Sequence, residues 1–436
     1  HSSCSHCHGE MSLISLRSAL LVLVVSVVVL LFFDHGPTRL PVHVDGRVEE
    51  KFAAVRDIFT QNFVDGWERG GASLVVMKDG KTVVDLWGGY ADRAALRKWK
   101  EDTLQITFST TKGVASVCVA MLVDRGYLSY DDLVTKYWPE FGKHGKGNLT
   151  VEMLLTHQAG LVYLDENLTE EDVLDHRVIS KRFEDQRPHW PPGTATGYHI
   201  YSFGWLVDQL VRRADPKKRS IGQFFREEVH QKYGIDYHIG LPSEHAARVA
   251  RLMPPSMIDR IGEIIFDVRV GKTLLLLGKL VDQSSALSRA LQNVGFLEAV
   301  HQMTVNNPDY WKIEQAAALG IGNARSLAQI YSLVLEKKLI SEKTLKIISK
   351  PSIDQLDVMS GDTVPKGHGF FYSKKSAKPF LFGHPGHGCQ QTFVDLENGL
   401  SLAYTTNALK MAHTPELCRT WKRIRDVIYD VIDGKQ

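Results

Sequence analysis

The spacing of apolar residues predicts one helix near the start of the main body of the chain and another at its C-terminal end. Between residues 47 and 69, apolar side chains such as Phe52, Val55 and Phe59 recur every three or four positions. That period is typical of one face of an amphipathic helix. Residues 415–432 show the same period. We therefore expect a helix over each range.

Two pairs of strands are predicted between these helices. Residues 72–92 hold two apolar runs on either side of Lys78-Asp79-Gly80, and Asp-Gly between such runs is a strong hairpin signal. Residues 379–409 hold two more apolar runs, which meet at a turn over residues 397–399. The order helix, hairpin, many helices, hairpin, helix predicts an α+β fold. We expect an antiparallel sheet flanked by the terminal helices, with a helical lobe inserted.

Two further stretches are helical in period and rich in apolar residues. Residues 108–122, FSTTKGVASVCVAML, open with a polar cluster and continue as small and apolar residues. This pattern predicts a buried helix, and Gly126 is a suitable residue to end it. Residues 257–294 are interpreted as helices packed within the inserted lobe. A substrate-covering lid and a membrane-touching surface are the alternatives for them.

The N-terminal region differs from the rest of the chain. Residues 1–10 carry Cys and His but no apolar anchor, so they are interpreted as a disordered tail or a non-native leader rather than a metal site. Residues 13–33 are predicted to be a transmembrane signal anchor, because the 16 residues from 18 to 33 carry no charge and about 20 span a bilayer. A cleavable signal peptide is the rival interpretation. Residues 34–46 are then a linker, and residues 47–433 form one domain.

These interpretations predict a single-pass membrane protein whose domain is lumenal or extracellular, with secretion or a mitochondrial location as alternatives. Asn148 and Asn167 each open an Asn-x-Thr triplet and are glycosylation candidates. The 436 residues are 44% hydrophobic and 23% charged, with a net charge of +2. This near balance gives no support for nucleic-acid binding. The five cysteines form a poor disulfide framework, and we expect at least three to be free.

The polar cluster before the apolar helix suggests nucleophilic chemistry. Ser109 and Lys112 are three residues apart, so they share a face of the helix and the amine can reach the hydroxyl. Burial among apolar residues favours a neutral amine, which can take the proton of a serine. In the alternative, both residues have structural roles only: Ser109 caps the helix and Lys112 is a surface charge.

Two other clusters add candidate groups. Tyr198 follows a Pro-Pro-Gly-Thr turn, where a phenol could project into a cleft and move a proton. His384 and Gly386 lie in GHPGHG, residues 383–388, on a predicted strand whose amides could donate to an oxyanion. Pro385 lacks an amide proton, so we expect this strand to lie at a sheet edge. Taken singly, each of these two clusters is more readily interpreted as structural.

In this order, the three clusters resemble the serine β-lactamase and penicillin-binding-protein superfamily. They are most similar to the class C β-lactamase-like branch, with its esterases, D-amino peptidases and eukaryotic lactamase-domain proteins. Three segments carry the resemblance: Ser109-Thr110-Thr111-Lys112 for Ser-x-x-Lys, Pro192-Gly193-Thr194 followed by Tyr198 for the catalytic tyrosine, and His384-Pro385-Gly386 for the third motif. Residues 87–92, 154–161 and 322–328 support it.

The resemblance implies a β-lactamase/transpeptidase-like fold and a serine hydrolase. Ser109 would attack an acyl carbonyl, and Lys112 and Tyr198 would manage its proton. The backbone amides of Ser109 and His387 would form an oxyanion hole beside a substrate strand. No metal or organic cofactor is implied. The expected partner is a small-molecule ester or amide, and a homo-oligomer is left open.

Two departures from the family's pattern narrow the expected substrates. Ile200 stands where lactamases carry the Asn of Tyr-x-Asn, and His384 stands where they carry a lysine. A histidine is mostly neutral at pH 7, so we expect little β-lactamase activity. The alternatives are a scaffold or assembly protein on the same fold, and a binding protein that is acylated without turnover. No Gly-x-Ser-x-Gly elbow occurs, which disfavours an α/β-hydrolase.

Overall fold

The computed structural model describes residues 18, 40–300, 302–374, 380–412 and 414–435. Its strands are β1 Val44–Val48, β2 Gly71–Lys78, β3 Lys81–Asp92, β4 Arg97–Lys98, β5 Gln105–Ile106, β6 His238–Ile239, β7 Gly320–Gly322, β8 Ile353–Leu356, β9 Thr363–Gly367, β10 Phe370–Lys374, β11 Phe380–Gly383, β12 Gln391–Asp395 and β13 Leu400–Thr406. Its α-helices are α2 Ala53–Val64, α3 Thr110–Asp124, α4 Val151–Leu155, α5 His176–Asp185, α6 Ser202–Ala214, α7 Ile221–Phe225, α8 Gln231–Tyr233, α9 Met257–Phe266, α10 Lys272–Val281, α11 Ala286–Gln292, α12 Ala324–Leu335, α13 Glu342–Ile348 and α14 Arg419–Ile432.

One large antiparallel sheet forms the centre of the fold. Its strands run in the order β1-β3-β2-β13-β12-β11-β10-β9-β8, and β4 pairs with β3 off this path. The N- and C-terminal parts of the chain therefore meet in the middle of the sheet, where β2 pairs with β13 and Val76 lies opposite Leu402. A small sheet, β5-β7-β6, lies at the start of α3.

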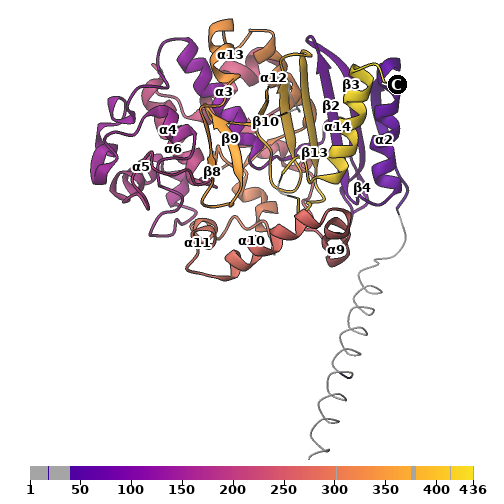
Figure 1. Cartoon of the computed structure of the whole chain (residues 1–436), viewed down its shortest axis with the longest axis horizontal. Helices are drawn as coiled ribbons and strands as arrows, with labels where there is room; N and C mark the ends of the chain where they lie inside the picture. Colours follow the sequence, from indigo (N-terminus) through magenta and orange to yellow (C-terminus); the bar gives the residue numbers. More distant parts are fainter. Residues whose placement is uncertain (1–17, 19–39, 301, 375–379, 413, 436) are drawn as a thin grey trace, which may run out of the picture.

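Helices cover both faces of the large sheet, and the alternation along β2 sorts its side chains between two cores. Leu74 and Val76 pack with the terminal helices α2 and α14, which lie side by side at the right of Figure 1. Val75 and Met77 face the other way and pack with α3 and α12. Since neighbouring residues of a strand point to opposite faces, a strand covered on both sides is apolar throughout. The predicted α+β arrangement, with terminal helices on one face, is confirmed.

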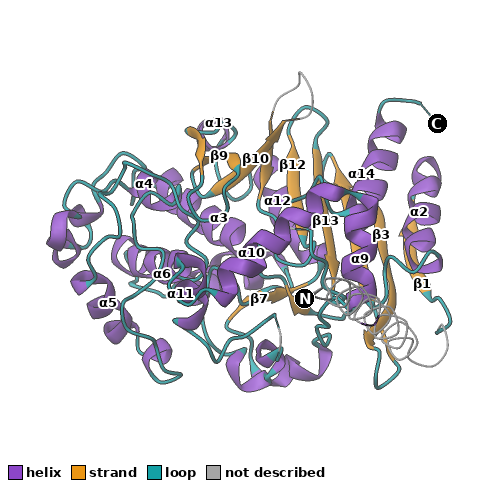
Figure 2. Cartoon of the chain, turned by 60° about the horizontal axis from the view of Figure 1, so that its bottom comes forward, coloured by secondary structure: helices purple, strands orange, loops and turns teal. Residues whose placement is uncertain are grey.

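The inserted helical lobe lies beyond α3 and is built mainly from α4, α5 and α6 (Figure 1). α9, α10 and α11 run along the lower edge of the molecule, and Figure 2 shows them crossing in front of it after the turn. Residues 257–294 are therefore helical, as predicted. However, Ile265 and Val268 are about 80% exposed, so this segment is not buried in the lobe along its whole length.

The first predicted hairpin is confirmed, with β2 and β3 on either side of Asp79 and Gly80. Both turn residues have positive φ angles, 49° and 78°, as the tight turn between two twisted strands requires. The helix expected over 47–69 is shorter at both ends. β1 takes up residues 47 and 48 and pairs with β3, a 3-10 turn covers Glu50–Phe52, and α2 ends at Val64. β1 alternates between half-buried and exposed residues and contains no apolar run, which is why the hydrophobic pattern did not indicate it.

The C-terminal region differs from the prediction in two ways. Residues 379–409 contain three strands, β11, β12 and β13, rather than two. β11 is also not an edge strand, since it pairs with both β10 and β12. Pro385 is compatible with this position because it lies beyond the end of β11 at Gly383, and the amides on either side of it, those of His384 and Gly386, donate to the carbonyls of Thr392 and Gln390.

The predicted membrane anchor requires a correction. Across the described residues, no helix is both long and apolar enough to cross a bilayer. The prediction of a single-pass membrane protein is therefore not supported. Apart from Ser18, the predicted span over 13–33 lies outside the described residues, as does the tail over 1–10.

The described cysteines include one disulfide, which uses two of the five cysteines, so the expectation of at least three free thiols stays a prediction. Cys389 and Cys418 form a disulfide with their Cα atoms 5.9 Å apart, whereas Cys118 is a buried free thiol in α3. The bond joins the residue before α14 to the loop that follows β11. That helix begins at Arg419, later than the predicted residue 415, after Cys418 with its extended backbone. Cys4 and Cys7 lie outside the described residues.

Candidate active site

Ser109 lies at the N-terminus of α3, but its hydroxyl does not cap the helix. Its side chain makes no capping hydrogen bond, although serine is among the preferred N-cap residues. The preceding residue, Phe108, has a φ of 47°, a conformation that is costly for an aromatic residue and that recurs at functional turns. This turn leaves Ser109 half-buried, whereas the next residues of α3 are fully buried.

Lys112 is completely buried one turn further along α3. Its Nζ lies 3.3 Å from Ser109 Oγ, 2.8 Å from the carbonyl oxygen of Ile200 and 3.0 Å from that of Ala317. None of the described ion pairs includes Lys112. Burial without a carboxylate therefore holds the pKa of its amine well below the usual value. The alternative of a surface lysine is excluded.

Tyr198 lies between the predicted turn and α6, and its ring is close to the amine of Lys112. Lys112 Nζ lies 4.6 Å from the ring centroid. Burial raises the pKa of the phenol, and a hydrogen bond with the side chain of Ser109 acts in the opposite direction. The structure thus brings the serine, the lysine and the tyrosine together from two separate segments of the chain.

The loop after β11 reaches the same place. The ring of His384 lies 6.1 Å from that of Tyr198, and the ring of His387 lies 5.2 Å from that of Phe108. Gly386 permits this approach, because a Cβ atom there would lie 2.5 Å from the carbonyl oxygen of Thr107. Within the described chain, neither the amide of Ser109 nor that of His387 donates a hydrogen bond to a protein acceptor.

The two departures from the family's pattern are visible in the structure. Burial lowers the pKa of His384 to about 3, so this side chain is neutral at pH 7. Ile200 belongs to an apolar cluster beside Tyr198 that includes Trp190 and, from α11, Leu287. His199, which lies between Tyr198 and Ile200 in the chain, is buried, and its Nε2 accepts a hydrogen bond from the backbone amide of Leu161. Neither His199 nor Ile200 has a side-chain amide group that could bind a ligand.

Two charged residues at the site were missed by the sequence analysis. Asp357 and Lys366 form an ion pair in which both side chains are 2% exposed, and Asp357 Oδ1 accepts a hydrogen bond from the backbone amide of Tyr198. They lie on either side of the β8–β9 turn, more than 150 positions from Tyr198 in sequence. No local spacing links them to the tyrosine. His157 was noted only as part of a supporting segment, yet its ring lies 4.9 Å from that of Tyr198.

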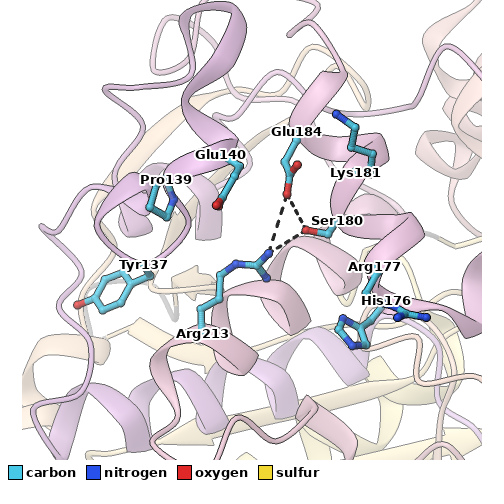
Figure 3. Close-up of a pocket in the computed structure, with 9 residues that line it drawn as sticks. All are labelled: Tyr137, Pro139, Glu140, His176, Arg177, Ser180, Lys181, Glu184 and Arg213. Carbon is cyan, nitrogen blue, oxygen red and sulfur yellow. Dashed lines mark hydrogen bonds and ion pairs between the residues drawn. The ribbon is translucent and has the colours of Figure 1, made fainter.

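A cavity of about 560 Å³ lies elsewhere, in the helical lobe (Figure 3). None of the candidate site residues lines it. Its charged groups are used within the lobe itself, since Arg213 donates to Ser180 Oγ over 2.8 Å and Glu184 accepts from both Ser180 and Trp138. The nine lining residues are Tyr137, Pro139, Glu140, His176, Arg177, Ser180, Lys181, Glu184 and Arg213. This cavity is therefore separate from the serine, lysine and tyrosine of the candidate site.

The other candidates from the sequence lie apart from this site. Asn148 and Asn167 are both exposed, and glycosylation of either stays a prediction. Among the described residues, no group of three or more His, Cys, Asp or Glu side chains is placed to hold a metal ion.

Comparisons with known proteins agree on one family. The Beta-lactamase family model matches residues 59–425. The Esterase/beta-lactamase LipL of Mycobacterium tuberculosis is 30% identical over 374 residues, which cover 84% of this chain and 83% of that protein. A family VIII carboxylesterase superposes with a TM-score of 0.76 at 32% identity, covering 88% of this chain and all of that one. A penicillin-binding protein homologue from Caulobacter crescentus gives 0.73 at 29% identity, with the same coverage.

Proposed function

Since the chain belongs to the beta-lactamase family and is a serine hydrolase with the β-lactamase/transpeptidase-like fold, we propose that it forms an acyl-enzyme at Ser109. In this proposal it hydrolyses small esters or amides and has little activity on β-lactams. The observation that carries the proposal is the set of three oxygen atoms around the amine of Lys112.

A neutral primary amine has two hydrogens and one lone pair. The two nearest oxygens to Lys112 Nζ are the carbonyls of Ile200 and Ala317, and carbonyl oxygens only accept hydrogen bonds. They therefore take both hydrogens of the amine. The lone pair is left for the third neighbour, the hydroxyl of Ser109 at 3.3 Å. In this arrangement the lysine is a general base that removes the serine proton.

The proposed reaction has two halves. Ser109 Oγ bonds to the acyl carbon as its proton passes to Lys112, and the carbonyl oxygen becomes an oxyanion. The amides of Ser109 and His387, which have no protein acceptor among the described residues, are suited to stabilise that oxyanion. The oxyanion then returns to a carbonyl as the bond from the acyl carbon to the leaving group breaks. Tyr198 gives its proton to the leaving alkoxide or amine, and Lys112 returns the serine proton to the oxygen of Tyr198. Water then repeats the steps on the acyl-enzyme, releasing the acid and restoring the serine.

The surroundings of the site favour neutral substrates over β-lactams. The side-chain amide and the cation that would hold a β-lactam are replaced by an apolar side chain and a neutral imidazole at Ile200 and His384. An anionic carboxylate would thus lose a charge-assisted hydrogen bond, which is about twice as strong as a neutral one. The likeness to a family VIII carboxylesterase supports the same preference.

The proposal is tested by labelling the full chain with a fluorophosphonate and measuring the intact mass. We expect one adduct on the wild-type protein and none on Ser109→Ala. Equal labelling of the two proteins would overturn the assignment of the nucleophile. Short-chain p-nitrophenyl esters and nitrocefin are then compared, and turnover of nitrocefin as fast as that of the esters would contradict the substrate preference.

A further inference from the structure

Three consecutive backbone amides around Tyr198 are held by acceptors outside their own segment. Gly197 N donates to the carbonyl of His157 over 3.0 Å, and His199 N donates to His157 Nδ1 over the same distance. Tyr198 N itself donates to Asp357 Oδ1 over 3.1 Å. The segment is neither helix nor strand. Its conformation therefore depends on these contacts rather than on regular secondary structure.

Asp357 is itself held firmly. Its Oδ1 also accepts hydrogen bonds from the amides of Met359 and Ser360, and its Oδ2 pairs with Lys366 Nζ. Lys366 Nζ reaches Thr196 Oγ1 at 3.2 Å, two residues before the tyrosine. The carboxylate thus joins the β8–β9 turn to the 196–198 backbone from one side. His157 holds the same backbone from the other side.

We propose that Asp357, Lys366 and His157, together called the tyrosine clamp, are positioning residues that keep the phenol of Tyr198 in register with Ser109 and Lys112. The inference rests on the proposed function of these three groups. The hydrogen bonds of the clamp to this segment reach its backbone and the hydroxyl of Thr196, and the ring of His157 also lies 4.9 Å from that of Tyr198. All three clamp side chains are buried, so the clamp acts through Tyr198 and not on the substrate. A misplacement of about 1 Å in a reacting group can cost a hundredfold in rate.

A buried ion pair by itself does not indicate this role, because such pairs can be replaced by apolar residues with little loss of stability. Removing one partner alone is uninformative, since the other is left as an unpaired buried charge. The informative change removes both charges and varies only the acceptor for Tyr198 N. Asn and Leu have the branching of Asp, but only Asn keeps an oxygen in the place of Oδ1.

The experiment compares Asp357→Asn/Lys366→Met with Asp357→Leu/Lys366→Met in the full chain. The rate of fluorophosphonate labelling of Ser109 and the melting temperature are measured for both. We expect the Asn variant to label within about threefold of wild type and the Leu variant about tenfold to a hundredfold more slowly. Both double variants are then combined with Tyr198→Phe. In that background the difference in labelling rate between the Asn and the Leu variant should shrink below about twofold, because effects that act through one group are not additive.

An undiminished difference between Asn and Leu on Tyr198→Phe would overturn the clamp, and so would equal labelling of the Asn and Leu variants. If the Leu variant fails to fold, His157→Asn and His157→Gln replace it, since only Asn presents an acceptor where Nδ1 lies. Slower labelling of the Gln variant supports the clamp, and equal labelling overturns it. If wild type is labelled and Ser109→Ala is not, while the effects of the Asp357 substitutions and of Tyr198→Phe on the labelling rate are additive, the proposed function stands and only this inference is removed.

Discussion

Two lysines at the site are equally buried and have different surroundings. Lys366 is paired with the carboxylate of Asp357, so its charge is compensated and it serves to hold a loop. Lys112 meets only uncharged oxygens, so burial depresses the pKa of its amine. The same residue type is therefore a structural cation in one place and a candidate base in the other. The difference lies in whether a carboxylate is within reach.

The lowered pKa of Lys112 predicts the direction in which kcat/KM changes with pH. The active form is the neutral amine, so kcat/KM on a p-nitrophenyl ester should rise as pH increases through that pKa. The plateau should be reached well below pH 10.5, the ordinary lysine value. Lys112→Arg should lower kcat/KM by about 10² to 10⁴, because a guanidinium does not lose its proton.

Lys146→Arg is the matched control for that measurement. Lys146 is also fully buried and donates to two backbone carbonyls, those of Glu184 and Gln186, but it lies in the helical lobe. The two variants insert the same extra volume, so both lose stability. A pH profile that changed equally in both would show that Lys112 is not the titrating base.

At the scale of elements, α3 determines how closely the pieces of the site approach. Gly113 follows Lys112 on this helix, and a Cβ atom there would lie 2.1 Å from Tyr331 Oη and 3.2 Å from His384 Cβ. The helix thus packs directly against α12 and against the loop after β11. A glycine inside a helix normally costs stability, and here it allows that contact.

The same substitution on two helices should have opposite effects. Gly113→Ala should lower the free energy of unfolding by about 1 to 3 kcal/mol through overpacking. Gly278→Ala, in α10, should raise it by about 0.5 to 1 kcal/mol, because an added Cβ there meets nothing within 4 Å and alanine favours the helix. Melting temperatures by differential scanning fluorimetry measure both. Stabilisation by Gly113→Ala would contradict the close approach of α3.

At the scale of the whole molecule, the central sheet and one disulfide bring distant segments together. The β2–β13 pairing joins the two ends of the domain. The Cys389–Cys418 bond then connects α14, on one face, to the loop that carries His384 and His387. The position of the candidate oxyanion donor at His387 thus depends on a covalent link to a helix that takes no direct part in the site.

Loss of this disulfide should be measurable as a loss of stability. The bond closes a loop of 29 residues in sequence, for which loop-closure entropy corresponds to about 3 to 4 kcal/mol. Cys389→Ala/Cys418→Ala should therefore unfold at lower urea concentration than wild type. A dithiothreitol-treated wild-type sample provides the control. A non-reducing peptide map that shows both thiols free would contradict the pairing.

Sequence periodicity and spacing by themselves determined the elements whose signals are local. The 3.6-residue period located α2 and α14, and Asp79-Gly80 located the first hairpin. The spacing of three positions from Ser109 to Lys112 was enough to place an amine near a hydroxyl. These features depend on neighbours within a few positions. The edge strand β1 was missed, since it presents no apolar run to detect.

Only the tertiary structure decided what surrounds those local features. Asp357, Lys366 and His157 contact the segment around Tyr198 from distant positions in the chain, and the Cys389–Cys418 bond spans 29 positions. No periodicity relates these contacts. β11 was expected at an edge from one proline, yet pairing with β10 and β12 places it inside the sheet. Burial lowers the pKa of Lys112, and no carboxylate among its described neighbours offsets that effect. Both conditions are properties of the packed interior alone.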